Sequence, residues 1–252
     1  MSAEPDTKRS STTREYVDSL LVTVILALFG TTFVLQAFKI PSSSMEDTLL
    51  IGDHLLVNKF VFGDEPGAGW GLLPYRQVRR GDIIVFKYPY PPHQHFVKRV
   101  IGLPGDRLKI VNRLVYINAQ PLPEPYKVHR RPPLAGRFQD SFPLKEDYFT
   151  YAVEPGWAAD VARLTQGDEL IIPANKYFAM GDNRDNSQDS RYWGFVDRRN
   201  IIGRPLLIYW SFDASRARSG NPGESARTTA AWDAFAHFFS RARWDRLLRF
   251  VR

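Results

Sequence analysis

A long run without any charged side chain, from Ser19 to Phe38, is the feature that most limits how this 252-residue chain can fold. At a rise of about 1.5 Å per residue, a helix over this run would be about 30 Å long, which matches the hydrocarbon core of a bilayer. A charge in the middle of such a helix costs about 2.5–3.5 kcal/mol on insertion scales. We therefore expect a polar N-terminal tail over residues 1–18 and one transmembrane helix over residues 19–38.

A cleaved secretory signal is the alternative interpretation of this run. Such signals have an apolar region of about 7–15 residues and small side chains at the cleavage site. Here the bulky Leu35 stands where a small side chain would be needed, which favours a retained anchor. Lys8, Arg9 and Arg14 precede the run. Because positive charge near the end of a span is retained on the cytoplasmic side, they favour a cytoplasmic N-terminus.

The composition excludes several classes of protein. Hydrophobic residues make up 44% of the chain, which is enough for a folded core. The net charge is +7, but the Lys and Arg residues are mostly scattered, so the charge does not indicate a nucleic-acid partner. The chain has no cysteine, which excludes thiol catalysis, cysteine zinc sites and disulfides together.

Short apolar runs alternate with turn residues throughout residues 40–212. Most runs hold about four to eight residues rich in Val, Ile, Phe and Tyr, bounded by Gly, Pro, Asn or Asp, a pattern typical of β-strands. We therefore predict a mainly β protein with antiparallel sheets over residues 39–213. Residues 121–140 are rich in Pro and basic side chains, and we expect them to form a loop or cover rather than core.

The C-terminal part has a different character. We expect a polar linker over residues 214–229 and a basic amphipathic helix over residues 230–252. The second segment contains several Arg residues, and its apolar side chains recur at near-helical spacing: Trp232, Phe235, Phe239, Leu247 and Val251. Such a helix either packs on its own domain or lies on the bilayer with its Arg residues near anionic head groups.

Three further segments carry candidate chemical groups. Three serines, Ser42 to Ser44, follow the apolar run, Lys98 lies inside an apolar strand, and residues 181–195 are dense in polar side chains. Singly, each has an ordinary explanation: a polar loop, an edge-strand lysine facing water, and a solvated turn. A calcium loop does not fit the third segment, because Arg184 stands where the EF-hand pattern requires Asp or Asn.

Taken together, these segments resemble the type I signal peptidases, the bacterial leader peptidases, which are membrane-bound Ser–Lys proteases. Residues 42–49 (Ser-x-Ser-Met-x-x-Thr-Leu) resemble the nucleophile box and residues 80–86 the strand box that follows it. Residues 98–106 resemble the general-base box and residues 181–195 the last box. The order and the spacing agree with the family, and the resemblance covers roughly residues 20–212.

The resemblance implies a serine protease without histidine, with Ser44 as nucleophile and Lys98 as general base. The Ser44 N–H and the Ser42 hydroxyl would hold the oxyanion, and Ser187 would orient the lysine. Supporting ion pairs and hydrogen bonds are implied for Arg99, Asp182, Asp189 and Arg191. Shallow substrate pockets would be lined by Phe38, Ile40, Met45, Leu49 and Val97.

A lysine base has to be neutral near the working pH. A lysine with the ordinary pKa of about 10.4 is only about 0.4% neutral at pH 8, so its pKa must fall by about 2.5 units. Burial among apolar neighbours supplies shifts of that size, and Val97, Val100 and Ile101 are suitable neighbours. The carboxylates of Glu46 and Asp47 would oppose the shift, and we expect them to face solvent.

The resemblance also implies the fold and the biological role. The fold would be an antiparallel β-sheet catalytic domain with a β-rich cover subdomain over residues 107–173, preceded by the transmembrane helix. The activity would be removal of signal peptides from exported preproteins after small residues of the Ala-x-Ala type. The partners would be preproteins and the phospholipid membrane, with no nucleic acid, metal or other cofactor. The protein would cross the inner membrane once, with its catalytic domain on the periplasmic side.

Two alternatives remain for the function. A Ser–His–Asp hydrolase is the nearest enzymatic one, but none of the histidines lies in a recognisable signature: His54, His93, His95, His129 and His237. His93 and His95 could share a strand face and bind a metal, but no third ligand is evident. A membrane-tethered β-rich binding module without catalysis would leave the four boxes as coincidence.

Overall fold

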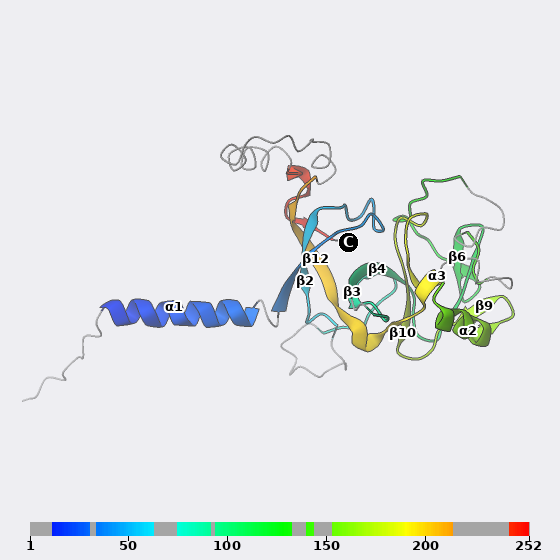
Figure 1. The fold of residues 1–252 in the computed structure, drawn as a ribbon, viewed down its shortest axis with the longest axis horizontal. Coiled ribbons are helices and arrows are strands. Elements are labelled where there is room, and N and C mark those ends of the chain that lie inside the picture. The colour runs from blue at the N-terminus through cyan, green and yellow to red at the C-terminus, as the bar shows by residue number, and fades with distance from the viewer. Residues whose placement is uncertain are drawn as a thin grey trace, which may run out of the picture.

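The computed structural model describes residues 12–30, 34–62, 75–91, 94–132, 140–143, 153–213 and 242–251. Within these ranges the chain forms two antiparallel β-sheets, and helix α1 (Thr12–Phe29) lies apart from both (Figure 1). The prediction of a mainly β protein with antiparallel sheets is therefore confirmed.

The larger sheet contains most of the strands. They are β1 (Leu35–Lys39), β2 (Asp53–Asn58), β3 (Ile83–Lys87), β4 (His95–Gly102), β10 (Lys176–Met180), β11 (Val196–Asp197), β12 (Ile201–Ser211) and β13 (Arg249–Phe250). Their spatial order is β1-β2-β12-β3-β4-β10-β11, and β13 also pairs with β12. The long strand β12 therefore lies between β2 and β3, which are close in sequence.

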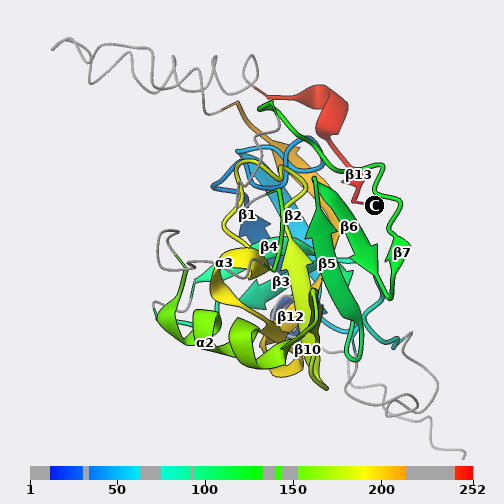
Figure 2. The ribbon, with the colours of Figure 1, turned by 90° about the vertical axis from the view of Figure 1, so that its right-hand side faces the viewer.

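The smaller sheet is built from residues 107–171 and has the order β7-β6-β5-β9-β8 (Figure 2). Its strands are β5 (Arg107–Val111), β6 (Leu114–Ile117), β7 (Gln120–Pro121), β8 (Thr165–Gln166) and β9 (Glu169–Ile171). Helix α2 (Pro155–Leu164) directly precedes β8 and was not expected from the sequence. Its Pro155 stands at the start of the helix, where the missing N–H would have had no partner in any case.

Burial follows the alternation of apolar side chains. In β2, buried and half-buried residues alternate because one face packs on the core. In the central strand β3, Ile83–Phe86 are all buried because both faces are covered. A core cluster below the loop between β1 and β2 consists of Ile40, Met45, Leu49, Leu55, Val57, Ile83, Val85, Ile208 and Val251.

The predicted boundaries of the N-terminal helix, 19–38, are wrong. The helix runs over Thr12–Phe29, and Leu35–Lys39 form strand β1, which pairs with β2 in the register Leu35↔Asn58 to Lys39↔His54. An uncharged run does not by itself distinguish a helix from a strand. Here the last residues of the run form a strand because they pair with β2. Across the described ranges, the structure contains no helix with the length and hydropathy that a membrane crossing requires.

The predicted C-terminal helix over 230–252 is wrong for its described part, residues 242–251. These residues form a short 3₁₀ turn, η5 (Trp244–Arg246), and the strand β13, which pairs with β12. Leu248 has a φ of 55°, which breaks a right-handed helix. The segment instead adds a short ladder to β12. The predicted linker and residues 230–241 lie outside the described residues.

The smaller sheet has a core centred on Trp157 of α2, and its loss should be costly. The indole is 1% exposed, lies edge-on to Phe195 at a ring distance of 4.9 Å, and donates from Nε1 to the Arg191 carbonyl at 3.0 Å. We expect Trp157→Ala to lower the free energy of unfolding by about 3–5 kcal/mol, as for other buried aromatic truncations. Urea denaturation followed by circular dichroism measures this. Trp244→Ala, at a tryptophan that is 53% exposed, is the control. An equal loss in both variants would contradict the assignment of Trp157 to this core.

Candidate active site

Ser44 and Lys98 lie side by side although they are far apart in sequence. Ser44 lies in the loop between β1 and β2, and Lys98 lies on β4 opposite Ile84 of β3. Lys98 Nζ donates a hydrogen bond to Ser44 Oγ at 2.7 Å. Both residues are buried, with exposures of 8% for Ser44 and 4% for Lys98. The arrangement gives a hydroxyl a nitrogen base at hydrogen-bonding distance.

The environment of Lys98 favours its neutral form. Burial lowers the pKa of its amino group from 10.5 to about 8, mainly because the charged form loses its hydration. The carboxylates of Asp189 and Asp182 oppose this effect, and the nearby Arg191 adds to it. Each carboxylate is already paired with an arginine, Asp182 with Arg99 and Asp189 with Arg191. Their field at the amino group is therefore largely cancelled, and burial prevails.

A cavity of about 360 Å³ opens beside this pair. It is lined by Phe38, Lys39, Ile40, Pro41, Ser42, Ser43, Ser44, Met45, Gln94, His95, Phe96, Val97, Lys98, Asn186 and Gln188. Four residues predicted to line the substrate pockets therefore lie at this cavity: Phe38, Ile40, Met45 and Val97. Leu49, predicted with them, does not line it, because its side chain is fully buried in the core below the loop.

The groups predicted to hold the oxyanion are close to the nucleophile. Ser42 Oγ lies 3.4 Å from Ser44 Oγ. Within the described part of the chain, the backbone N–H of Ser44 donates to no other group. These two donors therefore remain available next to the cavity.

Ser187 is buried nearby but does not bond to the lysine. Among the described residues its Oγ forms no hydrogen bond, although it lies near enough to Asp189 to contribute to the lowered pKa of that carboxyl group. A Cβ atom on Gly181 would lie 2.3 Å from Ser187 Oγ and 2.4 Å from the Ser44 carbonyl oxygen. Residue 181 therefore has to be glycine for the two serines to pack against it from either side.

Asp182 and Arg99 form the first of two buried ion pairs behind the site. Arg99 donates from Nε and Nη2 to the two carboxylate oxygens of Asp182 at 2.8 and 2.7 Å. The hydroxyl of Thr48 donates to the same carboxylate at 2.6 Å, and the ring of Tyr126 lies 4.0 Å below the guanidinium. Sequence reasoning found the ion pair as a supporting group but assigned no contact to Thr48 or Tyr126.

Asp189 and Arg191 form the second pair, and neither is exposed. Arg191 donates from Nε and Nη2 to Asp189, both at 2.8 Å, and Asp189 also accepts from the Gly181 N–H at 3.2 Å. A third buried pair, Arg184 with Glu124, was not predicted. No local sequence pattern predicts this ion pair, because Glu124 belongs to the distant Pro-rich segment.

The polar segment 181–195 also forms hydrogen bonds with residues 40–52, the loop between β1 and β2 that carries Ser44 (the nucleophile loop). Asn183 donates from its backbone N–H to the Ser44 carbonyl at 3.1 Å and from Nδ2 to the Ser43 carbonyl at 3.2 Å. Asn186 Nδ2 donates to Ser43 Oγ at 2.8 Å. The many Asn and Asp side chains of this segment indicated that it forms local hydrogen bonds. The sequence did not indicate that the partners are Ser43 and Ser44.

The two carboxylates next to Ser44, those of Glu46 and Asp47, lie near Arg130. Asp47 has a side chain that is 70% exposed and accepts from Arg130 at 2.7 Å. The Glu46 carboxylate lies 3.7 Å from the same guanidinium and is 25% exposed. Asp47 therefore faces solvent as expected, whereas Glu46 is partly buried.

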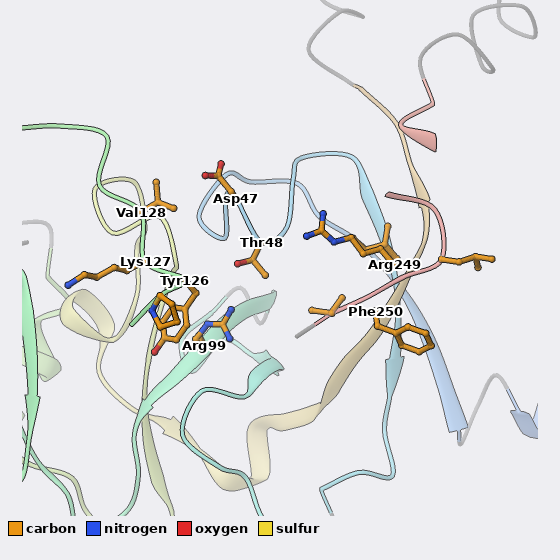
Figure 3. A pocket seen from close by; sticks show the side chains of 12 residues that line it. Asp47, Thr48, Arg99, Tyr126, Lys127, Val128, Arg249 and Phe250 are labelled. Atoms are coloured by element: carbon orange, nitrogen blue, oxygen red, sulfur yellow. The ribbon is translucent and has the colours of Figure 1, made fainter. Parts of the chain in front are cut away.

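A second and larger cavity, of about 870 Å³, lies on the other side of this loop. Figure 3 shows Thr48 facing it, with Arg99 and Tyr126 on one side and the strand that carries Arg249 and Phe250 on the other. The nucleophile loop is thus flanked by open space on two sides.

The histidines do not complete a serine-protease triad in the described part of the chain. His54 contacts Tyr209, His95 lies edge-on to Phe38, and His129 bonds to Asp185 at 3.0 Å. None of these three hydrogen-bonds with Ser44. His93 and His237 lie outside the described residues. Within the same limits, no three His, Asp or Glu side chains converge as metal ligands would.

Residues 13–210 match the family described as signal peptidase, peptidase S26. Three similar proteins named signal peptidase I come from Pseudomonas aeruginosa, Aquifex aeolicus and Leptolyngbya laminosa. The first is 34% identical, with 79% of this chain and 72% of the relative covered. The second is 33% identical, with 86% and 91% covered, and the third is 35% identical, with 81% and 82% covered.

A crystal structure of a signal peptidase I from Enterococcus faecalis V583 is 32% identical in sequence and covers 51% of this chain and 97% of its own, with a TM-score of 0.37. The family match spans most of the chain, and relatives above 30% identity cover more than two thirds of it. The chain therefore belongs to the signal peptidase family, peptidase S26.

Proposed function

We propose that this protein is a membrane-anchored serine endopeptidase that removes signal peptides from exported preproteins by means of Ser44 and Lys98. The observation that carries the proposal is the 2.7 Å hydrogen bond between Ser44 Oγ and the buried amino group of Lys98, at the wall of a cavity. Membership of the signal peptidase family supplies the reaction class, because relatives named signal peptidase I match most of the chain.

In the proposed reaction Ser44 Oγ attacks the carbonyl carbon of the scissile peptide bond. The neutral amine of Lys98 accepts the hydroxyl proton, so that no free alkoxide has to form. The negative charge that develops on the carbonyl oxygen is stabilised by the Ser44 N–H and the Ser42 hydroxyl. Lys98 then returns the proton to the departing amine, which leaves an acyl ester on Ser44. A water molecule then attacks the ester carbonyl and gives a proton to Lys98. Lys98 passes this proton to Ser44 Oγ as the acid product leaves, which restores both groups.

Ser187 stays a candidate for orienting the lysine. It is 5% exposed and lies against Gly181, as the Ser44 carbonyl does. Its hydroxyl lies near Asp189, whose pKa it helps to lower, and Asp189 in turn acts on the pKa of Lys98. Arg99, Asp182, Asp189 and Arg191 would hold the surrounding backbone and keep the charges around Lys98 balanced.

The proposed specificity for small residues follows from the walls of the cavity. Apolar side chains of Phe38, Ile40, Met45 and Val97 line it next to the nucleophile. Ile40 and Met45 are 3% and 2% exposed, so the surface that they offer is shallow. Small substrate side chains would fit against these walls without displacing them, and displacement of packed core residues is costly.

The proposed membrane anchor is supported by the surface of α1. None of its residues is buried, and several large apolar side chains, among them Leu21 and Ile25, are more than half exposed. An apolar surface of this kind is unfavourable in water. Insertion of α1 in the bilayer would remove it from water. It would also place β1 and the cavity, which follow closely in sequence, near the membrane surface, where anchored preproteins arrive.

The first prediction concerns the nucleophile. Ser44→Ala should reduce cleavage of a preprotein to less than a few per cent of the wild-type rate, because among the described residues Ser44 Oγ is the hydroxyl that hydrogen-bonds to the Lys98 amine. Gel analysis of purified protein with a preprotein measures this. Ser141→Ala, at a serine that does not line the cavity, is the control and should retain most activity. Substantial cleavage by the Ser44 variant would favour a binding module or another nucleophile.

The second prediction concerns the base and the pH. Because the neutral form of Lys98 is the active one and burial sets its pKa at about 8, kcat/KM should rise with pH. The neutral fraction is about a tenth at pH 7 and about nine tenths at pH 9, so the rise should be about tenfold. Lys98→Arg should be inactive, because a guanidinium does not deprotonate in this range. Lys87→Arg, on an exposed lysine of β3, is the control. A flat pH profile would exclude Lys98 as base.

The third prediction concerns the anchor. Ile25→Arg places a charge in the middle of the apolar surface of α1 and should lower membrane partitioning by about two orders of magnitude, equivalent to about 2.5–3.5 kcal/mol. Flotation with liposomes measures the partitioning. Val111→Arg is the control, because it replaces an apolar side chain of similar exposure on the smaller sheet. Equal flotation of the two variants would contradict the role of α1.

A further inference from the structure

The described C-terminal segment, residues 242–251, contacts the loop that carries the nucleophile. This nucleophile loop, residues 40–52, connects β1 and β2. Its two ends are joined by backbone hydrogen bonds of Ile40 with Gly52 and Asp53. The C-terminal segment lies beyond residue 210, where the family match ends.

Besides an exposed bond from Arg243 to the Ile51 carbonyl, Arg246 makes the buried polar contact between the two segments. Its guanidinium is 4% exposed and donates to both carboxylate oxygens of Asp53, from Nε at 3.1 Å and from Nη2 at 2.6 Å. Nη2 also donates to the Thr48 carbonyl at 3.0 Å. Asp53 is fully buried and accepts two further bonds, from the Leu50 N–H at 2.8 Å and from Ser211 Oγ at 2.7 Å.

Thr48 is consequently held from two directions. Arg246 binds its carbonyl, and its own hydroxyl donates to Asp182, which in turn binds Arg99. Arg99 is the next residue after the base Lys98. A continuous set of hydrogen bonds therefore runs from the C-terminal segment through the nucleophile loop to the strand that carries the base.

Among the described residues, cavities lie next to two parts of the loop, which leaves those parts dependent on hydrogen bonds. One cavity lies on the Ser44 side, and the larger one lies on the Thr48 side, walled in part by residues 248–251 (Figure 3). Met45 and Leu49 of the loop pack into the hydrophobic core, in the same cluster as Val251 of the C-terminal segment. The C-terminal segment thus supplies both a polar and an apolar contact to the loop.

We propose that Arg246 is a positioning residue that sets the distance between Ser44 and Lys98 by fixing the nucleophile loop through Thr48 and Asp53. The inference rests on the proposed function, because it concerns the efficiency of that site. Without the guanidinium, Asp53 is a buried carboxylate that has lost its counter-charge. The turn that it organises with Leu50 then rearranges, and the 2.7 Å contact of Ser44 with Lys98 is loosened.

The test compares three variants of the full chain: Arg246→Ala, Arg246→Lys and Arg249→Ala. The last removes an exposed guanidinium from the same segment and should behave as wild type. Arg246→Ala should lower kcat about 10–100-fold, because small displacements of reacting groups have effects of that size. KM should change little, since the cavity wall next to Phe38 and Val97 is intact. Arg246→Lys should be intermediate, because one ammonium pairs with Asp53 but does not reproduce the fork that also reaches Thr48.

The pH profile distinguishes positioning from folding. A loosened loop admits water to Lys98, so its kinetic pKa should rise by at least about half a unit in Arg246→Ala. A variant that is only less stable would lose activity in proportion to its folded fraction, with an unchanged kinetic pKa and kcat per folded molecule. That result, or full activity, would overturn the inference. If Arg246→Ala does not fold, Arg246→Lys is judged by the same criteria.

Hydrogen exchange tests the inference without any substrate. In Arg246→Ala, or in Arg246→Lys if the former does not fold, backbone amides of residues 44–50 should exchange about tenfold faster than in wild type, whereas those of β5 and β6 should not change. Unchanged exchange in the loop would overturn the inference even if activity fell. If the wild-type protein cleaves no preprotein, the proposed function fails, and the exchange rates alone decide whether Arg246 fixes the loop.

Discussion

The site depends on keeping one primary amine out of water. Burial lowers the pKa of Lys98 to about 8, because its strand has neighbours on both sides and its side chain is enclosed. The hydration of an ammonium ion is worth many kcal/mol, so even partial access of water would restore the charged form. Much of the surrounding structure can be understood as the means of excluding that water.

The ion pairs behind the site serve the same requirement by a different route. Two buried carboxylates, Asp182 and Asp189, would by themselves stabilise a charged lysine. Each is bound by an arginine through two hydrogen bonds, which weakens but does not remove its effect on the pKa of the lysine. The same carboxylates order the backbone, since Asp182 accepts from Thr48 and Asp189 from the Gly181 N–H. Charge balance and loop geometry are therefore maintained by the same side chains.

The sequence predicted the features that depend on local pattern. Alternating apolar residues indicated the strands, and four short motifs in order indicated which serine and which lysine to pair. It did not predict where the N-terminal helix ends, because Leu35–Lys39 are apolar enough for either structure and only pairing with β2 makes them a strand. Leu49 was assigned to the substrate pockets because it follows the nucleophile, whereas the turn directs it into the core.

The C-terminal segment shows the limit of periodicity more clearly. Spacing alone suggested a helix with its Arg residues on the outside, but Arg246 is buried against Asp53 and Val251 is part of the core. Neither partner could be found from the sequence, because Asp53 is almost two hundred residues away. The contacts of Arg184 with Glu124 and of Arg99 with Tyr126 are of the same long-range kind.

The position of β12 has a consequence for the order in which the protein acquires its site. β1 and β2 are neighbours in sequence and in space, as are β3 and β4, so each pair can form through local contacts early in folding. Ser44 belongs to the first pair and Lys98 to the second. In the sheet the two pairs are joined by β12, more than a hundred residues downstream, which lies between β2 and β3. A chain that has not yet placed β12 therefore lacks the strand that ties the Ser44 unit to the Lys98 unit, and the proposed proteolytic chemistry would begin only once the sheet is complete.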